Sequence, residues 1–114
     1  KVNVILGKAL GTAAIAMNSK AIGADMTFAW PDAQIGTMEG NLAAKIMYEG
    51  QGADVIKEKA AEYDALNCSA ASAARRGYVD SIVEPADTRK YVIGAFEMLF
   101  TKSEDRPAKK HGTV

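Results

Sequence analysis

The chain has 114 residues, of which 48% are hydrophobic and 25% charged, and this composition is typical of one compact globular domain. Its 14 basic and 14 acidic residues cancel, so the sequence predicts no broad electropositive surface for nucleic acid or for an acidic membrane. No apolar run approaches the roughly 20 residues that a membrane-spanning helix needs, and no signal peptide is recognised. The chain starts at Lys1 directly before a buried-strand pattern, so we expect it to be a piece of a longer protein.

Short apolar stretches alternate with amphipathic ones along the chain. Strands are predicted where short apolar or alternating runs are bounded by turn residues, at 2–6, 25–30, 33–37 and 78–83. Helices are predicted where apolar residues recur at helical spacing, at 11–19, 39–48, 54–67, 70–76 and 87–102. This alternation predicts an α/β fold whose strands are too few and too short for a self-sufficient sheet.

Two of the predicted helices carry an apolar stripe that needs a partner surface. In the helix at 54–67 the inner stripe is predicted to comprise Val55, Ile56, Ala60, Tyr63 and Leu66. In the helix at 87–102 the stripe is predicted to comprise Val92, Phe96, Leu99 and Phe100. Residues 1–103 form one unit in this interpretation, and residues 104–114 form a polar tail.

The segment most informative about function is the strand, turn and helix start within residues 2–19. Gly7 ends the apolar run, and the helix then begins at Gly11 with almost no side chains in its first turn. The first N–H groups of a helix lack partners within it and lie at the positive end of its dipole, so uncovered amides here suit an oxyanion. The alternative is that the small residues only let the helix pack tightly on the sheet, and the local pattern alone favours packing. The glycine spacing excludes a phosphate-binding loop.

Several single residues receive structural interpretations. Cys68 has no second cysteine to pair with, which suits a reducing, cytoplasmic setting, and we expect a small buried side chain there. The single histidine, His111, is distant in sequence and lacks partners for a metal site, so no metal is predicted. Asp25 and Asp32 are assigned to turns or caps, and Trp30 to a packing anchor.

Four short motifs occur in a fixed order over nearly the whole chain. They are GKALG with MNSK (7–11 and 17–20), GAD with AWPDA (23–25 and 29–33), AARRGYVD with IVEP (73–80 and 82–85), and KKHG (109–112). Together they resemble the C-terminal part of biotin-dependent acyl-CoA carboxyltransferases. This family includes the β-type subunit of propionyl-CoA and related carboxylases and the α-type subunit of biotin-dependent decarboxylases.

The resemblance implies a crotonase-like fold of repeated strand–strand–helix units, with this chain as the C-terminal half of the second such domain. It implies transfer of a carboxyl group between biotin, held on a separate biotin carboxyl carrier protein, and the α-carbon of an acyl-CoA. Backbone amides at Thr12 and Ala13, just after Gly11, would stabilise the ureido oxygen of biotin. Ile15 stands one turn into the helix, where the family varies with acyl-chain choice, and two interpretations of it stay open: contact with the acyl group, or a core residue. The resemblance further implies a homo-oligomer with its site between subunits, so the isolated chain is expected to be inactive.

The sequence departs from the family pattern at three positions. Thr12 stands where the family commonly has Gly, and Glu39 and Leu42 stand where it keeps small residues, which predicts a narrower or differently lined biotin pocket. Two interpretations of Arg75 and Arg76 stay open: contact with a CoA phosphate, or a solvated helix end near the negative dipole terminus, which is favoured.

Two other functions stay open from the sequence. The first is a CoA hydratase or isomerase of the crotonase class, although such enzymes usually place a carboxylate near the oxyanion hole and none follows Gly11 closely. The second is a non-catalytic assembly module whose helix at 87–102 docks neighbouring subunits.

Overall fold

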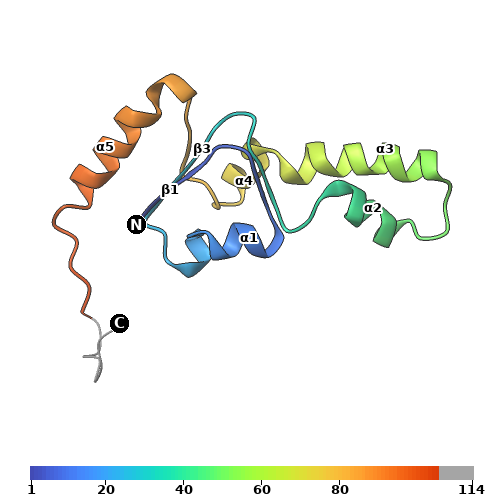
Figure 1. Cartoon of the computed structure of the whole chain (residues 1–114), viewed down its shortest axis with the longest axis horizontal. Helices are drawn as coiled ribbons and strands as arrows, with labels where there is room; N and C mark the ends of the chain where they lie inside the picture. The colour runs from blue at the N-terminus through green and yellow to red at the C-terminus, as the bar shows by residue number, and fades with distance from the viewer. Residues whose placement is uncertain (106–114) are drawn as a thin grey trace.

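The computed structural model describes residues 1–105, which form two small parallel sheets with helices around them (Figure 1). The first sheet has the order β1–β3–β5 and comprises β1 (Val2–Ile5), β3 (Met26–Ala29) and β5 (Ser81–Ile82). The second sheet pairs β2 (Lys8–Leu10) with β4 (Gln34–Gly36). The α/β class predicted from the sequence is confirmed.

The central strand of the larger sheet is β3. Thr27, Phe28 and Ala29 are all buried there, because β1 and β5 pair with β3 on its two sides and helices cover its faces. Such a strand in a parallel sheet carries an uninterrupted apolar run instead of an alternating pattern. This explains why the alternation in 25–30 is weak even though a strand was predicted there.

The sequence prediction missed strand β2. Residues 7–10 were interpreted as a tight turn, whereas Lys8–Leu10 pairs in parallel with Gln34–Gly36. A three-residue strand has no periodicity to detect, and it exists here because β4 supplies its partner. The chain therefore runs strand–strand–helix twice, as β1–β2–α1 and β3–β4–α2, and the second unit pairs with the first in parallel.

The helices agree with the predicted ones in position and are mostly shorter. The α-helices in the described part of the chain are α1 (Gly11–Ala16), α2 (Gly40–Met47), α3 (Ala53–Tyr63), α4 (Ala70–Arg75) and α5 (Thr88–Met98). Three short elements were not separated in the prediction: a 3₁₀ turn η1 (Lys20–Ile22), a π-helical turn η2 (Asp64–Cys68) that continues α3, and a 3₁₀ turn η3 (Pro85–Asp87) directly before α5. Strand β5 is also shorter than predicted, because the backbone amides of Gly77 and Tyr78 still donate hydrogen bonds to the carbonyl oxygens of Ala74 and Ala73 at the end of α4.

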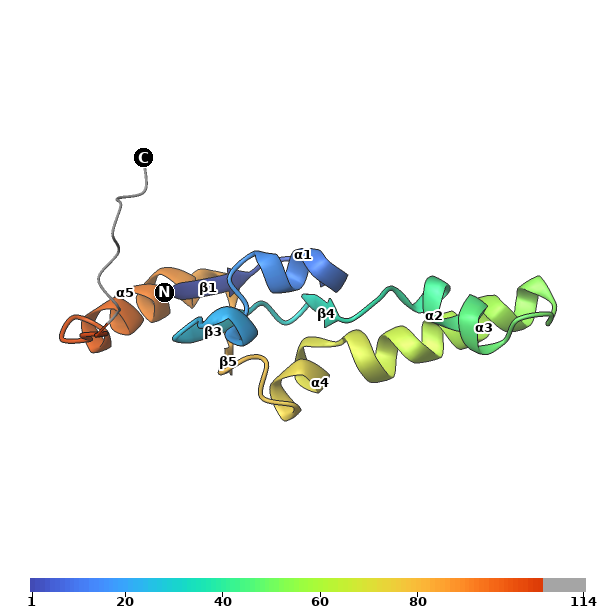
Figure 2. The same ribbon diagram turned by 90° about the horizontal axis from the view of Figure 1, so that it is seen from below.

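Helices α2 and α3 form a hairpin that extends away from the sheets (Figures 1 and 2). Gly40 lets the two helices meet, because a Cβ atom at this position would lie 2.3 Å from the carbonyl oxygen of Ala60. The Gly40 amide also donates a 2.8 Å hydrogen bond to Oδ1 of Asp64. The base of the hairpin is thus fixed by a close backbone approach and a carboxylate at the first residue of η2.

The core consists of two clusters of mostly small residues. The larger cluster joins α4 to both sheets and comprises Ala29, Ala33, Ile35, Ala70, Ala73 and Val79. The smaller cluster joins α5 to the larger sheet and comprises Phe28, Val83 and Ala95. Tyr91 of α5 adds an edge-to-face contact with Phe28, with ring centroids 5.7 Å apart.

The predicted stripe of α5 is wrong for two of its four members. Phe96 and Phe100 are 59% and 88% exposed, whereas Val92 and Leu99 are half-buried on either side of buried Ala95. The inner face thus follows the spacing i, i+3, i+7 centred on an alanine, and the two phenylalanines lie beside it.

The predicted stripe of α3 is likewise only partly correct. Ala60 is buried and Ile56 and Tyr63 are half-buried, but Val55 is 38% exposed and Leu66 is 64% exposed. Leu66 leaves the stripe because it lies in the π-helical turn, whose wider period rotates it away from the α-helical face.

Candidate functional site

Gly11 joins β2 to α1 with a backbone conformation that favours glycine. Its φ is +63°, in the left-handed region, and an added Cβ would approach the Thr37 carbonyl oxygen to 3.4 Å. The preceding Leu10 is extended and provides no side-chain cap, and the first turn of α1 contains no acidic residue. The amides at the start of α1 therefore have neither a partner within the helix nor a capping side chain.

A cavity of about 450 Å³ opens beside this helix start. Three of the four predicted site residues line it: Gly11, Thr12 and Ile15, the last with 52% of its surface exposed. The remaining wall comes from strands β1, β3 and β4, from η1 and from the α4 region, so segments far apart in sequence meet here.

Ala13 lines a different hollow. This second cavity has a volume of about 240 Å³ and lies between α1 and the β1–β2 segment, with Lys8 and Met17 also in its wall. The structure therefore groups Gly11, Thr12 and Ile15 and leaves the Ala13 side chain on the other side of the helix start. Glu39 and Leu42, expected to alter a pocket, line neither cavity: both are exposed, and Glu39 pairs with Lys8 at 3.4 Å.

Two residues that line the larger cavity carry a hydroxyl oxygen that is buried and is not itself exposed to the cavity. Ser19 Oγ and Thr27 Oγ1 are buried and have no hydrogen-bond partner among residues 1–105. The whole of Thr27 is only 1% exposed. Sequence analysis missed both residues, because a single Ser or Thr at a strand or turn carries no signal until the fold places it at a cavity.

Of the two arginines whose role the sequence left open, Arg75 and Arg76, only one lines this cavity. Arg76 lines it, and its Nη2 donates a 2.7 Å hydrogen bond to Oδ1 of Asn67, which also lines it. Arg75 does not line the cavity, and both arginines are exposed. Within the described residues Arg76 makes no ion pair. The only signal in the sequence was the position of Arg76 within the AARRGYVD motif.

Comparison with known proteins assigns the chain to a family. All of residues 1–114 match the model of the carboxyl transferase domain. The chain belongs to the carboxyl transferase domain family. It is 45% identical to the propionyl-CoA carboxylase beta chain of Saccharopolyspora erythraea, over 99% of this chain and 22% of that protein. It is 41% identical to the methylmalonyl-CoA decarboxylase subunit alpha of Propionigenium modestum, over 100% of this chain and 23% of that protein.

A solved structure in the same family has a very similar fold. Transcarboxylase 12S, with methylmalonyl-coenzyme A and methylmalonic acid bound, superimposes with a TM-score of 0.90 at 41% identity, over 99% of this chain and 22% of that one. The chain thus spans less than a quarter of the length of the relatives it matches.

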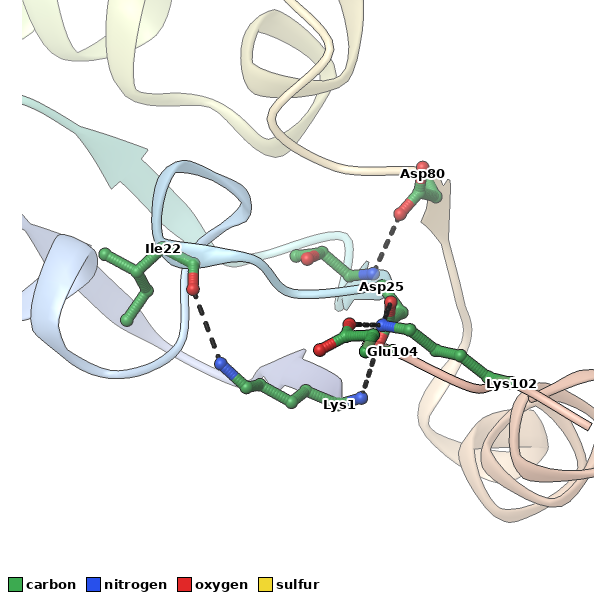
Figure 3. A network of polar contacts seen from close by, with 7 residues as sticks. Lys1, Ile22, Asp25, Asp80, Lys102 and Glu104 are labelled. Atoms are coloured by element: carbon green, nitrogen blue, oxygen red, sulfur yellow. Dashed lines mark hydrogen bonds and ion pairs between the residues drawn. The ribbon is translucent and has the colours of Figure 1, made fainter. Parts of the chain in front are cut away.

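Several residues of the family motifs in this carboxyl transferase domain have structural roles. Asp80, the last residue of AARRGYVD, accepts a 2.8 Å hydrogen bond from the Thr27 amide, drawn as the dashed line at Asp80 in Figure 3. Asp80 also pairs with Lys20 of η1. Burial raises the pKa of the Asp80 carboxyl, but the bonds from Lys20 and Thr27 outweigh it, so the pKa lies below its usual value. Asp80 therefore holds η1 and β3 together at one end of the cavity wall.

Asp25 lies in a cluster of charges at the start of β3. Its carboxylate pairs with Lys102 and, in the 114-residue chain, with the terminal amine of Lys1; Lys102 also pairs with Glu104 (Figure 3). The hydrogen bond from Lys102, followed by that from the Lys1 amine, lowers the pKa of Asp25 to about 2. Asp25 thus connects β3 to the segment after α5, a longer-range contact than the predicted turn or cap.

The structural roles predicted for Cys68, Trp30 and Asp32 are confirmed. Cys68 is 1% exposed, and burial raises the pKa of its thiol. Trp30 anchors α5 through a 2.9 Å bond from Nε1 to Thr88 Oγ1, and Asp32 lies in the turn closed by the Ala33 amide and the Trp30 carbonyl. His111 and the rest of KKHG lie outside the described residues.

Two searches of the described residues found no candidates. Residues 1–105 contain no group of three or more His, Cys, Asp or Glu side chains arranged to hold a metal ion. No helix in that part of the chain is long and apolar enough to cross a membrane.

Proposed function

We propose that the protein carrying this chain moves a carboxyl group between biotin, held on a carrier protein, and the α-carbon of an acyl-CoA thioester. The support is family membership over the whole chain together with relatives named as carboxylase and decarboxylase subunits. We further propose that the paired strand–strand–helix units belong to a crotonase-like superhelix, as the C-terminal half of its second domain. The partners are acyl-CoA, the biotin carboxyl carrier protein and further copies of the same subunit.

The start of α1 is the proposed biotin-side oxyanion hole. When the carboxyl group leaves N1 of biotin, negative charge develops on the ureido oxygen, and backbone donors placed there stabilise that charge. The observation that carries this assignment is the uncapped helix start, which follows a left-handed Gly11 and borders a cavity lined by Thr12 and Ile15. The donors are the amides of Thr12 and Ala13, so the hydroxyl of Thr12 is not needed for the role.

The hydratase or isomerase alternative finds less support. Such chemistry needs a carboxylate or comparable acid–base group within hydrogen-bond reach of the substrate. Among residues 1–105, no Asp or Glu lines either cavity. A carboxyl-transfer site that relies on backbone donors has no such requirement.

The assignment is tested by removing one backbone donor from the complete protein. Replacing Ala13 with proline deletes an N–H at a position in the first helical turn, where proline is tolerated. Turnover in carboxyl transfer between biotin and an acyl-CoA is expected to fall about 10²-fold or more, the usual scale for one oxyanion donor.

The matched control is Ala13→Ser, which keeps the amide and is expected to retain turnover within a few-fold. Circular dichroism checks that both variants fold, and Thr12→Pro provides a second test if Ala13→Pro does not. Near-normal turnover in a folded proline variant rejects the oxyanion role.

A further inference from the structure

The short turn η1 forms part of the wall of the larger cavity and is weakly held by its own contacts. Residues 19–21 line the same cavity as the start of α1. No residue of η1 is buried, so apolar packing does not fix its position. The backbone amides of residues 22–24 donate only to the carbonyl oxygens of Ser19 and Lys20, within the same segment. Side chains that reach other elements therefore decide how firmly this wall stays beside α1.

The ion pair of η1 joins it to a segment far away in the sequence. Lys20 Nζ pairs with the carboxylate of Asp80, which lies 60 residues away and directly before β5. Within residues 1–105, the other polar contact from η1 to a distant segment is the 3.4 Å bond from Lys1 Nζ to the Ile22 carbonyl (Figure 3). That bond is long and its donor is exposed, so the Lys20–Asp80 pair is the principal attachment of η1.

Asp80 is itself fixed on the central strand of the larger sheet. Its amide donates a 2.8 Å hydrogen bond to the Thr27 carbonyl, and its Oδ2 accepts a 2.8 Å hydrogen bond from the Thr27 amide. One carboxylate oxygen of Asp80 thus binds buried β3 and the other binds Lys20. Asp80 lines neither cavity, so it acts on a bound ligand only through the residues that it holds.

We propose that Asp80 is a positioning residue of the carboxyl-transfer site: through Lys20 it fixes η1, and so one wall of the cavity, relative to the donors at the start of α1. The inference rests on the proposed function for the reaction that it serves. A displacement of about 1 Å in a site costs up to about 10²-fold in rate, whereas a solvent-accessible ion pair contributes little to global stability. Loss of the pair is therefore expected to slow turnover per folded molecule without unfolding the protein.

The test removes each partner singly and both together in the complete protein. Lys20→Met removes the ammonium group and keeps most of the length of the side chain. Asp80→Asn removes the negative charge and keeps an oxygen for the Thr27 amide. Each single variant is expected to lower kcat for carboxyl transfer between biotin and an acyl-CoA about tenfold. The double variant is expected to lose no more than either single variant, because the two side chains act as one unit.

The pair between Asp25 and Lys102 provides the matched control. The Lys102 side chain is 34% exposed and that of Lys20 is 33% exposed, and each pairs with an aspartate next to β3. Neither Asp25 nor Lys102 lines a cavity. Lys102→Met is therefore expected to keep kcat within about twofold of the wild-type value. Lys20→Arg keeps the charge and is expected to restore kcat to within about threefold of that value.

Hydrogen exchange measured by mass spectrometry gives a readout that does not depend on activity. In Lys20→Met and Asp80→Asn, the amides of residues 22–24 are expected to exchange several-fold faster, while those of β3 keep their wild-type rates. Thermal unfolding measures the folded fraction of each variant, so that kcat is expressed per folded molecule. If Asp80→Asn does not fold, Lys20→Met and its Lys20→Arg rescue still test the pair.

Three results overturn the proposal. The first is a wild-type kcat per folded molecule in Lys20→Met. The second is a loss in Lys20→Met that folded Asp80→Asn does not share, since Lys20 would then act on the ligand directly. The third is an equal loss in Lys102→Met.

The proposed function fails separately. If the complete wild-type protein performs no carboxyl transfer, that function is rejected, and the exchange rates of residues 22–24 alone decide whether the pair holds η1. Unchanged exchange rates then reject the attachment as well. Carboxyl transfer by the wild type, with an unchanged kcat in Lys20→Met, rejects this inference and leaves the proposed function in place.

Discussion

At the scale of single residues, Gly40 is the described glycine at which an added Cβ atom would make the closest contact with its neighbours. Its missing Cβ would lie 2.3 Å from the Ala60 carbonyl oxygen and 2.6 Å from Cγ of Asp64. The Gly40 amide also binds Asp64, so the helix cannot move aside without losing that hydrogen bond. Glycine is therefore required at position 40 because the backbones of α2 and α3 approach closely there, and not because the residue has a positive φ.

Gly40→Ala is therefore expected to lower the free energy of unfolding by about 1–3 kcal/mol, as overpacking does in other proteins. Urea denaturation of the complete protein measures this change. Gly94→Ala is the matched control: it lies inside α5 with open space around its Cβ position, so it is expected to stabilise by about 0.5–1 kcal/mol. The same sign for both variants would contradict the packing argument.

Ile15 provides a residue-scale test of substrate choice. It lines the larger cavity one turn beyond Thr12, with about half of its side chain exposed. Ile15→Asp is expected to change the relative kcat/KM values for acetyl-, propionyl- and longer acyl-CoAs, because a charge in the wall penalises apolar chains according to their length. Steady-state assays of the complete protein measure these ratios.

The control for Ile15 is Ile22→Asp, which alters another exposed isoleucine outside the cavity. It is expected to leave the ratios unchanged. If all acyl-CoAs decline by one common factor in Ile15→Asp, the side chain serves packing alone.

At the scale of elements, what the sequence could predict depended on the length of each pattern. The amphipathic segments that became α2, α3 and α5 were predicted because several turns repeat the apolar spacing. Strand β2 was not predicted, because its three residues form a strand only through pairing with β4. Phe96 and Phe100 were wrongly placed on the inner face of α5. The apolar spacing alone does not indicate that a small residue, Ala95, occupies the centre of the contact with the sheet.

The candidate site likewise has one part that is contiguous in sequence and another part that only the fold brings together. The helix start at Gly11–Ile15 is contiguous in sequence, so the sequence could propose it as a site, although the small residues alone favoured packing and the family resemblance was needed to favour an oxyanion role. The other wall of the cavity is assembled from Thr27, Asn67 and Arg76, which lie up to 49 residues apart along the chain. No local pattern links these positions, so only the fold reveals that they line one cavity.

The segment after α5 is attached to β3 by charge, which makes this attachment sensitive to pH. The pKa of Asp25 falls from 3.8 to about 2 in the folded chain, chiefly through Lys102. A carboxyl with a depressed folded pKa contributes stability above its unfolded value, and that stability is lost as the pH falls from about 4 to about 2. We expect Asp25→Asn to remove this part of the pH dependence.

Thermal unfolding of the 114-residue chain across that pH range, at low and high salt, measures the effect. Because the pair is accessible to solvent, salt is expected to weaken it. Asp32→Asn is the control, since Asp32 is an exposed turn residue with no ion pair among the described residues. An identical acid transition in wild type and Asp25→Asn would show that the cluster in Figure 3 does not contribute to acid sensitivity.

At the scale of the whole molecule, large apolar side chains remain on the surface. Met17, Met98 and Phe100 are 75%, 71% and 88% exposed, and Phe96 is 59% exposed. The helical hairpin adds Leu42, Ile46 and Met47, each more than half exposed. Apolar surface gathered on several elements is typical of interaction surfaces, and closed symmetric assemblies of identical chains are the commonest way to cover it.

We therefore expect the 114-residue chain, prepared alone, to self-associate at micromolar concentration and to lack carboxyl transfer. It presents the proposed biotin-side donors and spans less than a quarter of the length of the relatives it matches. Sedimentation velocity measures the association, and Phe96→Lys with Phe100→Lys tests its cause: removing two exposed phenylalanines is expected to shift the distribution toward monomer. A wild-type chain that stays monomeric contradicts the surface argument, and carboxyl transfer by that monomer contradicts the division of the site between two parts of the protein.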